Sequence, residues 1–108
     1  MVREYMVRRT SIKRQPTHPG ALLAADIFPA LRLNVTQAAE RLRVSRQTLH
    51  RIISGRTAIT PEMAVRLGKL CGNGPGLWLR MQQAYDLWQA QKRLKSELAK
   101  IPAVHATT

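Results

Sequence analysis

The chain has 108 residues, enough for one compact domain with tails, and its 44% hydrophobic content argues against disorder throughout. Eighteen Lys and Arg against six Asp and Glu give a net charge of +12, so nucleic acid is the leading candidate partner. A single cysteine excludes an internal disulfide framework, and residues near Met1 lack a signal-like apolar region, which points to the cytoplasm. The longest apolar stretch, 21–25, is too short to span a membrane.

The positive charge also fits two roles that need no nucleic acid. A basic surface can simply keep a protein in solution, or it can contact an anionic membrane surface. The basic residues are scattered through several segments instead of forming one face of a long amphipathic helix, which disfavours the membrane.

Residues 1–17 carry several basic side chains, one acidic side chain and no sustained periodicity, and we expect a flexible basic arm there. The segments that follow have helical spacing and are separated by Gly, Pro or Asn. No long alternating strand pattern occurs. The predicted fold class is therefore all-α, with five helices.

The first predicted helix spans about 19–28 and ends where Pro29 disrupts it. The second spans about 36–42. Thr36 is placed to cap its free N–H groups.

The third predicted helix spans about 45–54, capped by Ser45 and stopped by Gly55. The fourth spans about 60–71 and begins with a threonine cap followed by proline.

The fifth predicted helix is the longest, at about 75–100, and a flexible tail, 101–108, follows it. Apolar side chains recur along one side of this helix at three- and four-residue intervals. We expect a dimer interface formed by Leu77, Trp78, Met81, Tyr85 and Trp88. The alternative is that the stripe folds entirely onto the chain's own core.

Residues 36–52 have the anatomy of a helix-turn-helix within a single domain, 18–100. Two short helices joined by a tight turn need a small residue where they cross, and Ala39 supplies it. Val44 is the expected buried turn residue, and Leu49 with Ile52 anchors the second helix.

With those positions inward, polar side chains suited to base edges face outward at the start of the third helix. The candidate base-reading residues are Arg46, Gln47, Thr48, His50 and Arg51. Candidate phosphate contacts, which fix register without reading sequence, are Gln37, Arg43, Ser45, Arg56 and Thr57. Arg43 occupies a turn position where glycine is usual, because the backbone there tends to be left-handed.

An enzyme is the rival class. His18, His50 and His105 are far apart and lack the neighbours that a metal site or an acid–base pair needs. Cys71 fits a small buried filler, and the glycine-rich stretch 72–76 lacks the lysine of a phosphate-binding loop. No enzyme activity, metal or cofactor is predicted.

Several motifs lie between residues 18 and 90: His18-Pro19-Gly20, Val44-Ser45-Arg46-Gln47-Thr48, Ile59-Thr60-Pro61-Glu62-Met63-Ala64, Trp78-Leu79 and Gln83-Ala84-Tyr85-Asp86-Leu87-Trp88. With them the chain resembles the HigA-type (VapI-like) antitoxins, part of the Xre/Cro family of lambda-repressor-like domains. The opening His-Pro-Gly combined with the closing Ala-Tyr-Asp-Leu-Trp is more specific than a helix-turn-helix alone.

The resemblance implies a homodimer that binds an inverted repeat in its own promoter and neutralises a HigB toxin, a small mRNA-cleaving enzyme. It implies that the last helix carries dimerisation. It also implies base reading by Arg46, Gln47, Thr48 and Arg51, and phosphate contacts by Gln37 and Arg56. The basic arm is outside the shared pattern. A solitary repressor, or a toxin-binding module with little DNA specificity, remains an alternative.

Overall fold

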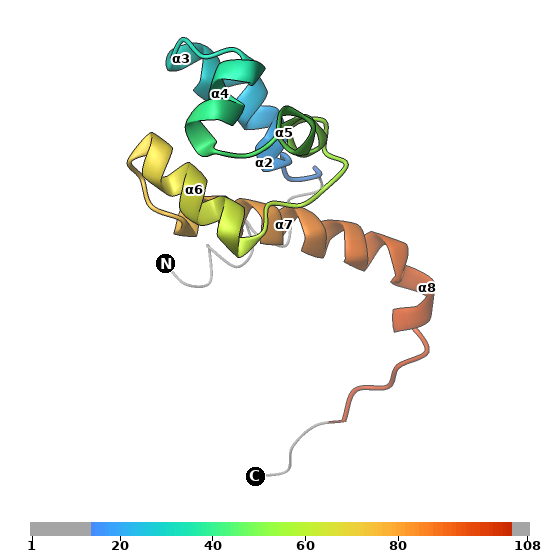
Figure 1. Ribbon diagram of the computed structural model, residues 1–108. Coiled ribbons are helices and arrows are strands. Elements are labelled where there is room, and N and C mark those ends of the chain that lie inside the picture. Colours follow the sequence, from blue (N-terminus) through green and yellow to red (C-terminus); the bar gives the residue numbers. More distant parts are fainter. Residues whose placement is uncertain (1–13, 105–108) are drawn as a thin grey trace.

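A computed structural model describes residues 14–104, and most of the expected basic arm and the last part of the tail lie outside this range. Every regular element in this range is helical, as Figure 1 shows, which confirms the all-α prediction. No helix among these residues is long and apolar enough to cross a membrane.

The first helix runs on through three joined segments: α2 (Pro19–Leu22), η1 (Leu23–Ile27) and α3 (Phe28–Ala30). The prediction that Pro29 ends this helix near Phe28 is wrong. Proline lacks the N–H that an α-helix needs, but η1 is a π turn in which the Phe28 N–H bonds to the Leu23 carbonyl. The wider turn lets the backbone continue to Ala30.

The helix-turn-helix consists of α4 (Val35–Leu42) and α5 (Arg46–Ile53). Ser45 caps α5 as predicted, since its Oγ accepts from the Thr48 N–H at 3.0 Å. The predicted cap of α4, Thr36, is wrong.

Asn34 caps α4 instead, and the helix begins one residue earlier than expected. The Asn34 Oδ1 accepts from the Gln37 N–H at 2.8 Å, and the Gln37 Oε1 accepts from the Asn34 N–H at 2.9 Å. This reciprocal capping box satisfies two backbone donors, whereas a lone threonine cap satisfies one.

The fourth helix, α6 (Pro61–Cys71), agrees with the prediction at both ends. The Thr60 Oγ1 accepts from the Met63 N–H at 3.2 Å, and Gly72 ends the helix in a left-handed conformation, with φ of 76°.

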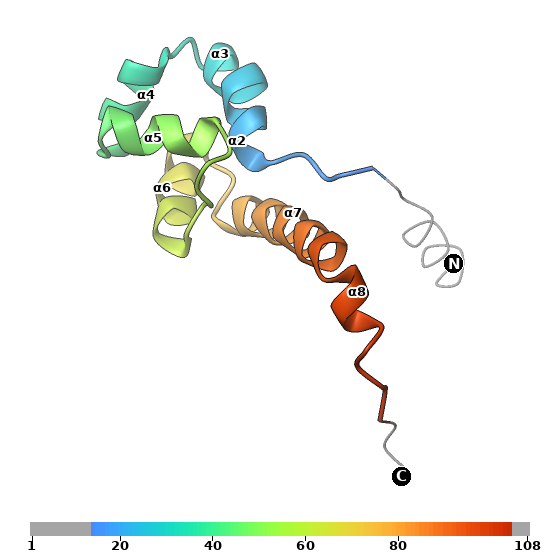
Figure 2. The ribbon, with the colours of Figure 1, turned by 90° about the vertical axis from the view of Figure 1, so that its right-hand side faces the viewer.

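The fifth helix is shorter than expected. It divides into α7 (Gly76–Arg93) and α8 (Lys95–Leu98), because Leu94 leaves helical geometry with ψ of 12°. All side chains of 91–104 are exposed, so tertiary packing does not stabilise this part of the chain. In Figures 1 and 2, α8 and the segment after it point away from the helical body.

The core collects one or more apolar side chains from nearly every helix up to α7. Its members are Leu23, Phe28, Ala38, Ala39, Leu42, Leu49, Ile52, Ile59, Met63, Ala64, Leu67 and Trp78. Gly20 on α2 lies so close to α5 that an added Cβ would overlap the Ile52 carbonyl. Val44, expected to be buried, is half-buried at the edge of this core.

The position of Trp78 differs from the predicted dimer interface. Its side chain is 0% exposed, because the first turns of α7 pack against α6 and α2. A side chain without accessible surface makes no contact with a second chain. The other predicted interface residues, Leu77, Met81, Tyr85 and Trp88, all keep some exposed surface.

Candidate nucleic-acid interface

The outer face of α5 forms one side of an open groove of about 500 Å³. The groove is lined by Arg46, Gln47, His50, Arg51, Ser54 and Arg56. Four of the five predicted base-reading residues and one predicted phosphate contact therefore meet at one place. None of the lining side chains is acidic, so the groove suits an anionic ligand.

The helix itself explains this grouping. Leu49 and Ile52 are buried under α5, which turns positions 46, 47, 50, 51 and 54 outward along one face. Ser54 was not predicted as a site residue, although its helical spacing from His50 and Arg51 places it on this face. Its hydroxyl donates to the Arg51 carbonyl at 3.1 Å.

Thr48 lies apart from the other base-reading candidates. It lines a different hollow, between α5 and α6, together with Val44 and Ile52. Its hydroxyl oxygen accepts from the Ser45 Oγ at 2.7 Å. The hydroxyl groups of Ser45 and Thr48 therefore both take part in the cap of α5, although both side chains are exposed.

Gln37 and Arg43 are exposed but do not line the groove along α5. The Gln37 oxygen is held in the capping box, so its amide N–H groups are the donors that can face a phosphate.

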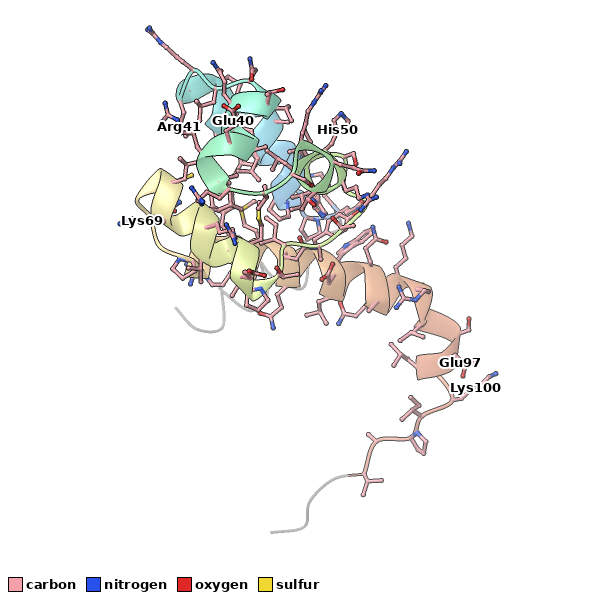
Figure 3. All side chains as sticks on the ribbon, in the orientation of Figure 1. Glu40, Arg41, His50, Lys69, Glu97 and Lys100 are labelled. Carbon is pink, nitrogen blue, oxygen red and sulfur yellow. The ribbon has the colours of Figure 1, made fainter. Side chains whose placement is uncertain are left out.

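The backbone of Arg43 has a left-handed conformation, with φ of 61°, as expected for this turn position. The neighbouring Arg66 on α6 donates to the Leu42 carbonyl at 2.8 Å and to the Arg43 carbonyl at 3.2 Å. These bonds satisfy carbonyls at the end of α4 and hold the turn. Arg43 lines a second hollow with Arg41, Arg66 and Lys69. Figure 3 shows Arg41 and Lys69 on the side of the molecule away from His50.

Arg56 and Thr57 begin the segment that follows α5. Gly55 reverses the chain with φ of 79°, and the Arg56 N–H then donates to the Arg51 carbonyl at 2.9 Å. The Thr57 N–H reaches the same carbonyl at 3.3 Å. Both side chains are exposed, and backbone bonds hold the segment to the recognition helix. Arg56 lines the groove, whereas Thr57 lines the hollow between α5 and α6 together with Thr48.

Comparison with known proteins agrees with this geometry. A family described as a helix-turn-helix domain matches residues 2–85. The antitoxin HigA-1 of Vibrio cholerae is 32% identical over 85 residues, covering 79% of this chain and 80% of that protein. This chain belongs to the HigA-type antitoxins of the Xre/Cro helix-turn-helix family.

Solved structures of HigA proteins share the fold. An addiction-module antidote protein of the HigA family from Coxiella burnetii has a TM-score of 0.78 and 30% identity, covering 85% of this chain and all (100%) of that one. Pseudomonas aeruginosa antitoxin HigA, solved with the higBA promoter, has a TM-score of 0.79 and 25% identity, covering 84% of this chain and 100% of that one.

In this HigA-type chain, sequence reasoning missed one buried polar side chain beside the interface. Gln82 on α7 is 5% exposed and accepts from the Ile59 N–H at 2.8 Å. Its spacing from Trp78 and Tyr85 places it on the inner face of the helix. A glutamine there is a recognisable sign of a buried hydrogen bond.

Away from the groove, two features bear on enzyme chemistry: the surroundings of Cys71 and the distribution of possible metal ligands among the described residues. Burial raises the pKa of the half-buried Cys71 thiol, which disfavours the reactive thiolate. Across residues 14–104, no three His, Cys, Asp or Glu side chains gather as they would around a metal ion.

Proposed function

We propose that this HigA-type protein is a sequence-specific DNA-binding repressor and the antitoxin of a HigBA toxin–antitoxin system, acting in the cytoplasm. The observation that carries the proposal is the groove along α5, where Arg46, Arg51 and Arg56 lie with Gln47 and His50 and without an acidic side chain. Arginine donates a bidentate pair to guanine and glutamine pairs with adenine, so this set reads a major groove.

The remaining contacts position the protein on the duplex. We assign base reading to Arg46, Gln47, His50 and Arg51, and phosphate contacts to Gln37, Arg56 and Thr57. Arg43 is peripheral to this assignment, because it lines the hollow with Arg41 and Lys69. Thr48 is also peripheral, because its hydroxyl is engaged with Ser45 in the cap of α5. The Ser45 hydroxyl contributes chiefly by capping α5.

We further propose that the protein is a homodimer that binds an inverted repeat in the promoter of its own operon. Two recognition helices about 34–36 Å apart would enter successive major grooves. The Pseudomonas HigA solved with the higBA promoter supports an operator of this kind.

The first test is fluorescence anisotropy on the DNA upstream of the gene, with a scrambled duplex of equal length as competitor. Arg46→Ala is expected to cost roughly 1–3 kcal/mol and to relax preference at one base position. Lys69→Ala is the matched control, because it also removes one positive charge but lies on the side away from His50. Equal binding of the wild-type protein to both duplexes would contradict sequence-specific recognition.

The antitoxin assignment has a separate test. The protein is co-expressed with the product of the adjacent gene, and the complex is assayed for mRNA cleavage with and without this chain. A stable complex in which cleavage is suppressed supports the antitoxin. If no complex forms, the protein is a solitary repressor of the same family.

A further inference from the structure

A buried polar contact connects α7 to the segment that follows the recognition helix. The Gln82 Oε1 accepts from the Ile59 N–H at 2.8 Å, and the Gln82 Nε2 donates to the Asp86 Oδ1 at 2.9 Å. Both ends of the amide are therefore engaged, which fixes its orientation. Gln82 and Ile59 are both buried, so water does not readily replace this bond.

Ile59 belongs to the short segment that carries two of the assigned phosphate contacts. Arg56 and Thr57 precede it by three and two residues, and Thr60 directly after it caps α6. The beginning of the segment is bonded to α5 through the Arg51 carbonyl, and its end to α7 through Gln82. Three helices thus hold one loop at the edge of the groove.

We propose that Gln82 is a positioning residue for DNA binding, which sets the place of Arg56 and Thr57 relative to the recognition helix through its bond to Ile59. This inference rests on the proposed DNA-binding function. Gln82 lies under the loop and does not itself touch DNA.

The physical reason is that the two kinds of DNA contact come from different parts of the chain. The position of the loop sets the phosphate contacts, whereas the position of α5 sets the base contacts. Without the Gln82 oxygen, the buried Ile59 N–H has lost its partner, and the loop moves to find another one. Such a shift moves Arg56 and Thr57 but leaves Arg46 and Gln47, which lie on the first turn of α5. Affinity then falls equally on every DNA sequence, because phosphate contacts carry no base information.

The test compares Gln82→Met, which is similar in length but lacks the amide, with Gln83→Met at the exposed neighbouring position. Anisotropy is measured on the operator and on scrambled DNA, at a temperature where circular dichroism shows each variant fully folded. Gln82→Met is expected to weaken binding roughly five- to tenfold on both duplexes, leaving their affinity ratio unchanged. Gln83→Met is expected to bind like the wild type.

A double-mutant cycle identifies the route of the effect. In an Arg56→Ala, Thr57→Ala background the Gln82→Met loss should shrink towards zero, because the donors that Gln82 positions are gone. Amide hydrogen exchange provides a readout in the free protein. The Ile59 N–H should exchange faster in Gln82→Met than in Gln83→Met.

Each outcome has one meaning. Wild-type affinity of a folded Gln82→Met, or a full loss that persists in the double-alanine background, overturns the positioning role. If Gln82→Met does not fold, Gln82→Asn decides the question, because its shorter side chain keeps the amide but withdraws the oxygen from the Ile59 N–H. An equal loss of affinity on both duplexes in Gln82→Asn supports the proposal, and wild-type affinity overturns it. If the wild-type protein binds the operator and scrambled DNA equally well, the proposed sequence-specific function is wrong, and that result is distinct from a failure of the Gln82 proposal.

Discussion

His18 forms the N-terminal cap of α2 and lies against α7. Its Nδ1 accepts from the Gly20 N–H at 2.9 Å, and its ring meets that of Tyr85 edge to face with centroids 4.9 Å apart. Burial lowers the pKa of His18 below its ordinary value, although the nearby Asp86 carboxylate and the Thr57 backbone act in the opposite direction. The folded chain therefore favours the neutral imidazole.

This lowered pKa predicts a loss of stability on acidification. Between the folded-state pKa and the unfolded value of about 6.5, the unfolded chain binds more protons. The contribution of His18 to stability is thus complete above about pH 6.5 and decreases as the pH falls below that value. Protonation would also remove the acceptor that the Gly20 N–H needs.

Thermal unfolding between pH 7.5 and pH 5 measures this effect. His18→Gln, whose side chain still offers an acceptor, should show a flatter dependence of the melting temperature on pH. His50→Gln removes an exposed histidine on α5 and should keep the wild-type slope. Equal slopes for His18→Gln and the wild-type protein would refute the assignment.

At the scale of helices, the start of α4 shows how two similar sequence signals compete. Asn34 and Thr36 are both good caps, and they stand two residues apart. Gln37 decides between them, because it is three residues after Asn34 and completes a capping box with it. Asparagine is also the better cap of the two by intrinsic preference, so preference and spacing both identify Asn34, and the prediction of Thr36 overlooked this pair.

The two caps make different predictions for stability. Asn34→Ala should lower the free energy of unfolding by about 1 kcal/mol, because Gln37 loses its reciprocal partner. For a domain of this size that corresponds to about 4–8 °C in melting temperature. Thr36→Ala is the control and should change stability by less than about 0.5 kcal/mol. A larger loss in Thr36→Ala than in Asn34→Ala would identify Thr36 as the cap.

At the scale of the whole molecule, one apolar stripe serves two purposes along α7. Its beginning, at Trp78 and Met81, packs onto the chain's own core. Further along, Trp88 on the same side is half-buried, and Leu94, Leu98 and Ile101, which lie beyond the end of α7, are exposed. The alternative of a stripe used only by the core thus holds for the first turns, and the exposed part is the surface we propose for dimerisation.

Trp88 is the test of that surface. It is half-buried beside the exposed Leu87, with the Lys92 Nζ 5.1 Å from its ring centroid. Trp88→Ala is expected to weaken self-association at least tenfold while the monomer keeps its helical content. Sedimentation equilibrium measures the dimer fraction, with Val65→Ala on α6 as the control, because Val65 is an exposed apolar side chain on a different helix. An unchanged dimer fraction in Trp88→Ala would exclude this part of α7 as the interface.

The local signals in the sequence determined the all-α fold class, the caps of α5 and α6, and the outward face of the recognition helix. These depend on neighbouring residues: Ser45 and Thr60 satisfy nearby N–H groups, and burying Leu49 and Ile52 forces Arg46 and His50 outward. Tertiary structure alone decided that the first helix continues past Pro29, that Trp78 belongs to the core, and that Gln82 reaches Ile59, 23 residues away in the chain. Periodicity shows which side of a helix is apolar, but it does not show what covers that side. That depends on how helices distant in sequence pack together, and the same packing determines which buried polar groups find partners.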